Sequence, residues 1–260
     1  MKKFFRRLIF LLIVLTIAWF HADTVKLLWR EATFYLSEHT ETELKVKKYA
    51  EDNGVFYGQY PENLIDLLER NPETEDFVLR YPFRDEEELE IFEYDLSEGV
   101  PLMMQWDQRW GYEHYGSDVV GITGCGPVCL AMAGYYVTGG DERFHPAKMV
   151  TFAAENGYYA KGNGSSWTLI SEGAEKLGLS ATELPLVKKK MVDAVESGSP
   201  VILAMGKGDF TSSGHYIVLT GWDGEAFTVN DPNSKIRSQQ LWTYEQLEKQ
   251  IRNIWSIELA

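Results

Sequence analysis

The sequence has little cysteine and no paired-cysteine motif. Of its 260 residues only Cys125 and Cys129 are cysteine, and they stand four positions apart. In a helix this spacing does not suit a disulfide, and a zinc site would need two further ligands. The sequence also lacks a nucleotide-binding glycine fingerprint and a HExxH motif. We therefore expect no disulfide framework, no metal and no cofactor.

Acidic residues outnumber basic residues in this sequence. The chain has 25 Lys and Arg against 39 Asp and Glu, which gives a formal net charge of −14. Such a chain repels a phosphate backbone, so a nucleic-acid partner is not expected and a neutral or cationic substrate is favoured. Hydrophobic residues make up 45% of the sequence, enough for one substantial core and a smaller unit.

The first residues combine positive charge with a short apolar run. Four basic residues within positions 2–7 precede the apolar residues 8–20. This order is typical of a secretory signal peptide, although an uncleaved anchor is the alternative for a run shorter than a span of about 20 residues. We expect residues 1–22 to be a signal peptide or an N-terminal membrane anchor, with residues 4–20 providing any membrane association. The protein is then extracytoplasmic, either secreted or anchored to the cell membrane.

Residues 23–98 form a separate acidic region that we expect to be helical. A helix pattern starts at Pro61, runs to Arg70 and resumes until Pro82. The acidic run 85–88 is interpreted as a solvated face. A sharper hypothesis makes the region a pro-region or a lobe that guides substrate.

Cys125 stands at the start of an apolar helix pattern. Residues 124–127 read Gly-Cys-Gly-Pro, and the pattern that follows predicts a helix over 126–138. At a helix N-terminus the unpaired N–H groups and the helix dipole favour a thiolate, the attacking form of cysteine. The competing interpretation is a cysteine that packs as a small hydrophobe, which we expect for Cys129 inside the same helix.

His215 is the histidine that opens a strand. Residues 215–222 and 225–230 are expected to be two strands joined by a turn at Asp223-Gly224. Folding this hairpin places His215 opposite Asp231 or its immediate neighbour. A catalytic imidazole needs such a partner to fix its orientation. The alternative is that Asp231 merely forms a turn before a proline.

The order of elements predicts an α+β fold. The helix that follows Cys125 is expected to pack against an antiparallel sheet. Before the sheet, we expect helices at 126–138, 145–155, 166–177 and 188–197.

Four segments together resemble the C39-like branch of papain-fold cysteine peptidases over roughly residues 99–260. These segments are Gln-Trp-Asp-Gln-Arg-Trp-Gly at 105–111, Gly-Cys-Gly-Pro at 124–127, Gly-His at 214–215 and Asn-Asp-Pro at 230–232. The resemblance implies a papain-like fold in which N-terminal helices pack on an antiparallel sheet. It also implies, in turn, an oxyanion donor, a nucleophile, an acid and base, and an orienting carboxylate at Gln105, Cys125, His215 and Asp231.

The gap between Gln105 and Cys125 is longer than is usual in papain-like enzymes, and Gln108 is the alternative oxyanion donor. The resemblance implies an exported cysteine peptidase that acts on a peptide or protein through a Cys-His-Asp triad. A peptidoglycan endopeptidase or amidase with the same triad is the first alternative. The others are an acyltransferase with an amine acceptor and a non-catalytic binding module on a peptidase scaffold.

Overall fold

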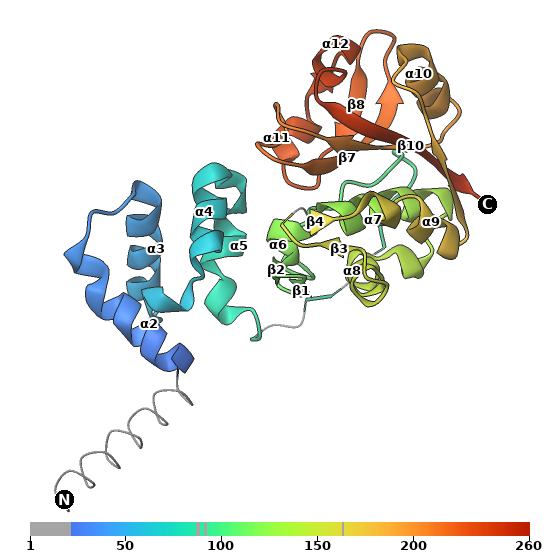
Figure 1. Cartoon of the computed structure of the whole chain (residues 1–260). Helices are drawn as coiled ribbons and strands as arrows, with labels where there is room; N and C mark the ends of the chain where they lie inside the picture. The colour runs from blue at the N-terminus through green and yellow to red at the C-terminus, as the bar shows by residue number, and fades with distance from the viewer. Residues whose placement is uncertain (1–21, 87–88, 91–92, 163) are drawn as a thin grey trace, which may run out of the picture. The chain divides into compact units, whose positions relative to one another are not determined.

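The computed structural model describes residues 22–86, 89–90, 93–162 and 164–260 (Figure 1). They fall into two compact units, the first ending at Asp85 and the second running from Glu86 to Ala260. The expected signal peptide or anchor, apart from its last residue, lies outside the described residues. Within the described part of the chain, no helix is both long and apolar enough to cross a membrane.

The first unit, as far as it is described, consists of helices. Thr40 is the N-cap of the helix Glu41–Asp52 and forms a capping box with Glu43. The Thr40 hydroxyl accepts from the N–H of Glu43, and the Glu43 carboxylate accepts from the N–H of Thr40. Pro61 precedes the next helix, as the sequence predicts. The elements are α2 (Ala22–Thr33), η1 (Phe34–Leu36), α3 (Glu41–Asp52), η2 (Tyr57–Gln59), α4 (Glu62–Arg70), η3 (Pro72–Thr74), α5 (Glu75–Leu79) and η4 (Tyr81–Phe83).

The helices of the second unit centre on α7 (Cys125–Val137). Every residue from Gly126 to Tyr135 is buried, because this helix is apolar on all sides and lies in the middle of the core. Gly134 lets a neighbouring ring approach, since a Cβ there would come 2.1 Å from Phe144 Cδ1. The other helical elements are α6 (Val120–Thr123), η5 (Glu142–Phe144), α8 (Pro146–Glu155), η6 (Trp167–Leu169), α9 (Glu172–Lys176), α10 (Lys188–Glu196), α11 (Lys235–Ser238) and α12 (Tyr244–Leu247).

A six-stranded antiparallel sheet forms the other half of this unit, in the order β5-β10-β6-β7-β8-β9. Two short pairs, β1-β2 and β3-β4, stand apart from it. The strands are β1 (His114–Tyr115), β2 (Asp118–Val119), β3 (Tyr159–Ala160), β4 (Gly164–Ser165), β5 (Leu179–Glu183), β6 (Val201–Met205), β7 (His215–Trp222), β8 (Phe227–Asn230), β9 (Leu241–Trp242) and β10 (Ile251–Leu259).

Both faces of the central strands are covered. In β6, Ile202 and Ala204 belong to the core cluster that contains α7, whereas Val201, Leu203 and Met205 belong to the cluster that contains α10. This explains why β6 is a continuous apolar run rather than an alternating one. The layers are visible in Figure 1, where α7 and α10 lie on opposite sides of the sheet.

The α+β fold with helices before an antiparallel sheet is confirmed. One expected helix is wrong in detail, because residues 166–177 form η6 and a separate short helix, α9. The first half of this segment contains Thr168, Ile170 and Ser171, which are weak helix formers. A continuous helix therefore has little intrinsic support there.

Candidate active site

Cys125 is the first residue of α7 and follows the N-cap residue Gly124. Its side chain is partly exposed, whereas Cys129 is completely buried. Burial raises the pKa of the Cys129 thiol well above its ordinary value, so this thiol stays neutral in the core. Of the two cysteines, only Cys125 therefore combines access with a helix N-terminus.

The glycines beside Cys125 allow close packing of the surrounding chain. A Cβ on Gly126 would lie 2.6 Å from Ser165 Oγ, and one on Gly124 would lie 2.4 Å from a methyl carbon of Val120. Both distances are far below van der Waals contact. The two glycines thus let β4 and α6 pack directly against the start of α7, next to Cys125.

His215 is buried at the start of β7 and its ring contacts two partners. Its Nε2 lies 2.7 Å from Asp231 Oδ1, and Cys125 is close enough to contribute to the rise of its pKa. Because Nε2 serves the carboxylate, Nδ1 is the nitrogen left for the thiol. Burial alone would lower the pKa of His215, but the charge and hydrogen bond of Asp231, together with Cys125, raise it to about 10.

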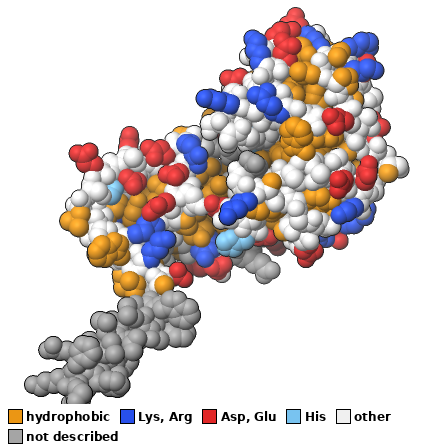
Figure 2. All heavy atoms as spheres, viewed as in Figure 1, with side chains coloured by type: hydrophobic (Ala, Val, Ile, Leu, Met, Phe, Trp, Pro, Cys, Tyr) orange, Lys and Arg blue, Asp and Glu red, His pale blue; other side chains and the backbone are white. Residues whose placement is uncertain are grey.

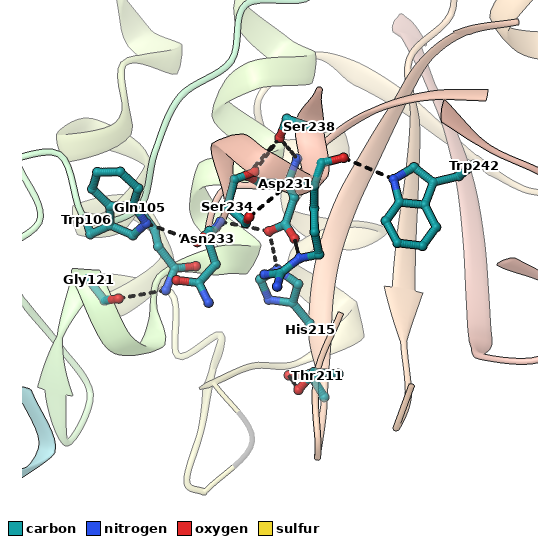
Figure 3. A network of polar contacts seen from close by, with 12 residues as sticks. Gln105, Trp106, Gly121, Thr211, His215, Asp231, Asn233, Ser234, Ser238 and Trp242 are labelled. Atoms are coloured by element: carbon teal, nitrogen blue, oxygen red, sulfur yellow. Dashed lines mark hydrogen bonds and ion pairs between the residues drawn. The ribbon is translucent and has the colours of Figure 1, made fainter. Parts of the chain in front are cut away.

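Asp231 is fully buried and is held on both carboxylate oxygens (Figure 3). Its Oδ1 also accepts the N–H of Asn233 at 2.8 Å, and its Oδ2 accepts Nε–H of Arg237 at 2.5 Å. Burial raises the pKa of this carboxyl, but His215 and Arg237 outweigh that effect and keep the pKa below its ordinary value. The group is therefore a carboxylate in a fixed orientation.

The hairpin brings His215 and Asp231 together in an unexpected way. A turn forms at Asp223-Gly224, with Gly224 at a φ of 106°, but the second strand begins at Phe227 rather than at the expected residue 225, and the register shifts between Leu219 and Gly221. As a result β8 ends at Asn230, opposite Val218, and Asp231 follows the end of the strand. The two side chains meet by turning towards each other beyond the ladder.

Gln105 lies beside the loop that follows β8. Its backbone N–H donates to Pro232 O at 2.8 Å, and its Nε2 donates to Gly121 O at 2.8 Å (Figure 3). An amide has two N–H donors, so one remains for a ligand. The Oε1 atom is buried and has no hydrogen-bond partner within the described part of the chain.

Gln108 lies in the same turn but is only half-buried. The bonds that tie this turn to the loop after β8 come from Gln105 and from Trp106, whose Nε1 donates to Asn233 O at 3.1 Å. The long gap between Gln105 and Cys125 holds β1, β2 and α6, which fold as a small hairpin and a helical turn.

The sequence analysis did not identify Arg237 or the hydrogen-bonded group formed by Tyr115, Ser165 and Tyr216. Arg237 comes six positions after Asp231 in a very short helix, so no periodic pattern marks it. The hydroxyls of Tyr115 and Ser165 are 2.8 Å apart, and Tyr216 donates to Ser165 O at 3.2 Å. Burial raises the pKa of Tyr115 to about 12, against the effect of Ser165, so this neighbour of Cys125 stays a neutral phenol.

No group of three or more His, Cys, Asp or Glu side chains that could hold a metal ion occurs among residues 22–86, 89–90, 93–162 and 164–260.

The sequence matches the Peptidase_C39 like family over residues 97–257, which is more than half of the chain. The chain belongs to this family. The resemblance inferred from the motifs is thereby confirmed, and membership in a C39-like family supports a peptidase. No match was found among curated proteins.

Two solved structures are similar to this Peptidase_C39 like protein. The peptidase domain of Streptococcus ComA, a bifunctional ABC transporter involved in a quorum-sensing pathway, is 20% identical with a TM-score of 0.42, covering 62% of this chain and 98% of that one. A Bacillus anthracis protein described as a C39-like peptidase is 16% identical with a TM-score of 0.36, covering 60% and 94%.

Proposed function

We propose that the protein is a cysteine peptidase that hydrolyses peptide or amide bonds through Cys125, His215 and Asp231. The observation that carries the proposal is the continuous chain of contacts from the thiol to the buried carboxylate. His215 interacts electrostatically with Cys125, and its Nε2 lies 2.7 Å from Asp231 Oδ1. A raised His215 pKa of about 10 favours an imidazolium beside the sulfur, which supports a thiolate–imidazolium pair.

The first half of the proposed reaction is acylation. The sulfur of Cys125 attacks the substrate carbonyl carbon and a tetrahedral oxyanion forms. The first turn of a helix has N–H groups without partners inside the helix, so the Cys125 N–H and the free N–H of Gln105 are the proposed donors to that oxygen. His215 gives its proton to the leaving amine, and the C–N bond breaks.

The second half is deacylation. Neutral His215 takes a proton from water, the resulting hydroxide attacks the thioester, and the C–S bond breaks with return of the thiolate. Asp231 keeps the imidazole in one orientation and stabilises its positive form, as the orienting carboxylate does in serine-protease triads. The fixed carboxylate, held by Arg237 and the Asn233 N–H, suits this role.

The first test is the rate of Cys125 alkylation by iodoacetamide between pH 5 and 9, located by peptide mapping. We expect Cys125 to react at pH 6 at least about tenfold faster than in His215→Ala, because a paired thiolate is the reactive form. Buried Cys129 is the internal control and should remain unmodified in the folded protein. Equal, slow reaction of Cys125 in both proteins would favour the binding-module alternative.

The second test addresses catalysis directly. Cys125→Ala should abolish hydrolysis of a peptide mixture while the circular dichroism spectrum stays unchanged, and Cys129→Ala should keep most of the activity. Digestion of isolated cell-wall material in parallel separates general peptidase action from the peptidoglycan endopeptidase or amidase alternative, since only the latter releases stem peptides. Loss of activity in Cys129→Ala alone would contradict the assignment.

We also propose that residues 1–22 direct the protein out of the cytoplasm. The basic cluster within positions 2–7, followed by the apolar residues 8–20, motivates this. Cell fractionation with mass spectrometry of the N-terminus tests it. Recovery of the full-length chain in the membrane fraction indicates an anchor, a new N-terminus in the extracytoplasmic fraction indicates cleavage, and recovery in the cytoplasm would contradict the proposal.

A further inference from the structure

Helix α2 of the first unit turns its apolar residues outward. None of its residues is buried. At about 100° per residue, Val25, Leu28 and Trp29 fall on one face, and their side chains are 50%, 51% and 69% exposed. Leu36, in the following η1 turn, is 82% exposed. In an ordinary surface helix the apolar stripe faces the core. In α2 these apolar side chains face the solvent instead.

The inward face of α2 is fixed by polar contacts. Arg30 Nη1 donates to Tyr60 O at 2.6 Å, and its guanidinium lies 5.3 Å from the Tyr57 ring. Glu31 forms an ion pair with Lys47 of α3. Rotating the helix to bury the apolar stripe would break all of these contacts.

The backbone of α2 is also seated closely on its unit. A Cβ on Gly58 would come 2.4 Å from the carbonyl oxygen of Leu27, so only glycine permits the helix to lie this close. The orientation of α2 is therefore built into the first unit. Figure 2 shows hydrophobic side chains exposed on the surface of this unit. Several exposed large apolar side chains on one helix face mark a candidate interaction surface.

The sequence before α2 indicates what covers this surface. Residues 8–20 are apolar and four basic residues precede them, and only His21 separates Phe20 from the first residue of α2. Because one residue spans at most about 3.6 Å, a helix starting at Ala22 begins within about 10 Å of the end of the apolar run. A chain whose apolar run enters a bilayer must therefore place the start of α2 near the bilayer surface.

We propose that the α2 face, defined as Val25, Leu28, Trp29 and Leu36, lies in the interface of a lipid bilayer into which residues 8–20 insert. Amphipathic helices bind in this way with one apolar face buried at the headgroup boundary, and tryptophan is enriched at that depth. The inference rests on the proposed membrane insertion of residues 8–20. It adds a second contact that fixes how the first unit is held against the membrane.

Two tryptophans ten positions apart provide separate reporters. The full-length protein is reconstituted into phosphatidylcholine vesicles with about 30% phosphatidylglycerol, with and without lipids brominated on the acyl chain, which quench nearby tryptophans. The difference in fluorescence between the wild type and Trp19→Phe is the signal of Trp19, which reports on the apolar run. The difference between the wild type and Trp29→Phe is the signal of Trp29, which reports on the α2 face. We expect both signals to be quenched.

A matched pair of variants tests the surface itself. Leu28→Glu should reduce the quenching of Trp29 at least about threefold, because a charge at this depth opposes burial in lipid. Leu44→Glu places the same charge on α3, where Leu44 is 53% exposed, and should leave the quenching unchanged. Circular dichroism of both variants checks that they fold.

The outcomes separate the two proposals. Quenching of Trp19 without quenching of Trp29 overturns the α2 face and leaves membrane insertion standing. Absence of quenching at Trp19 overturns the proposed insertion, and the inference falls with it. Lipid-independent self-association, detected by sedimentation and abolished by Leu28→Glu, would show that a second copy covers this face and would also overturn the inference.

Discussion

Arg237→Met tests the network that holds Asp231. The substitution removes the guanidinium whose Nε–H donates to Asp231 Oδ2 at 2.5 Å. Breaking a fully buried charge pair costs about 3–5 kcal/mol. The Arg237 side chain is 25% exposed and Asp231 keeps His215 as a partner, so we expect a smaller loss of about 1–3 kcal/mol in the free energy of unfolding.

The loss should shrink towards acid pH. Arg237 helps to keep the pKa of Asp231 below its ordinary value. A carboxyl of this kind contributes stability that is present above its unfolded pKa of about 3.9 and is lost as pH falls through the folded value. Without Arg237 the folded pKa rises towards the unfolded value, so the variant loses less stability than the wild type on acidification, and the two free energies of unfolding should converge at low pH.

Urea unfolding at several pH values between 3 and 7 measures both effects. Arg143→Met is the matched control, because Arg143 pairs with Asp141 at 2.7 Å on the surface, with side-chain exposures of 61% and 28%. Exposed pairs contribute about 1 kcal/mol or less. If Arg237→Met matched this control in free energy and in pH dependence, the network would not hold Asp231, and the reasoning would be wrong.

Gly126→Ala should lower stability by about 1–3 kcal/mol in thermal unfolding, since its Cβ would lie 2.6 Å from Ser165 Oγ, whereas Gly214→Ala meets no atom within 4 Å and should change little. The free energy of unfolding should fall as pH rises from about 8.5 towards the His215 pKa of about 10, by up to about 1.4 kcal/mol per pH unit, because in this range an unfolded thiol has lost its proton while folded His215 keeps one; His215→Ala should remove this slope. Burial chiefly lowers the pKa of His145. The free energy of unfolding should therefore fall as pH falls below about 6.5, where this histidine becomes protonated more readily in the unfolded chain. In urea titrations His145→Leu should then flatten the acid side; an unchanged slope would speak against the buried neutral ring.

The sequence predicted the elements whose local pattern matches their surroundings. The helix after Cys125 and the hairpin from His215 onward appear where expected, because a proline, a glycine turn and apolar periodicity specify them locally. Their packing into an α+β fold follows from the same pattern, since an all-apolar helix must be covered on every side.

Other features depend on tertiary contacts and leave no local signal. The contact of Arg237 with Asp231 depends on how the loop after β8 folds back, and the register shift in the β7-β8 hairpin has no mark in its sequence. The inward polar face of α2 depends on carbonyl oxygens of η2 and Tyr60 and on Lys47 of α3. A helix wheel alone would have predicted the opposite orientation.

The sheet order also has a consequence for the order in which the second unit can assemble. β10 lies between β5 and β6, and α7 packs on β6, β7 and β10. During synthesis, the strand that completes the seat of α7 is therefore made after every strand that it joins. Until β10 has been made, α7 therefore lacks one of the three strands of the sheet on which it packs. The helix that carries Cys125 thus reaches its final packing only when the end of the described chain has joined the sheet.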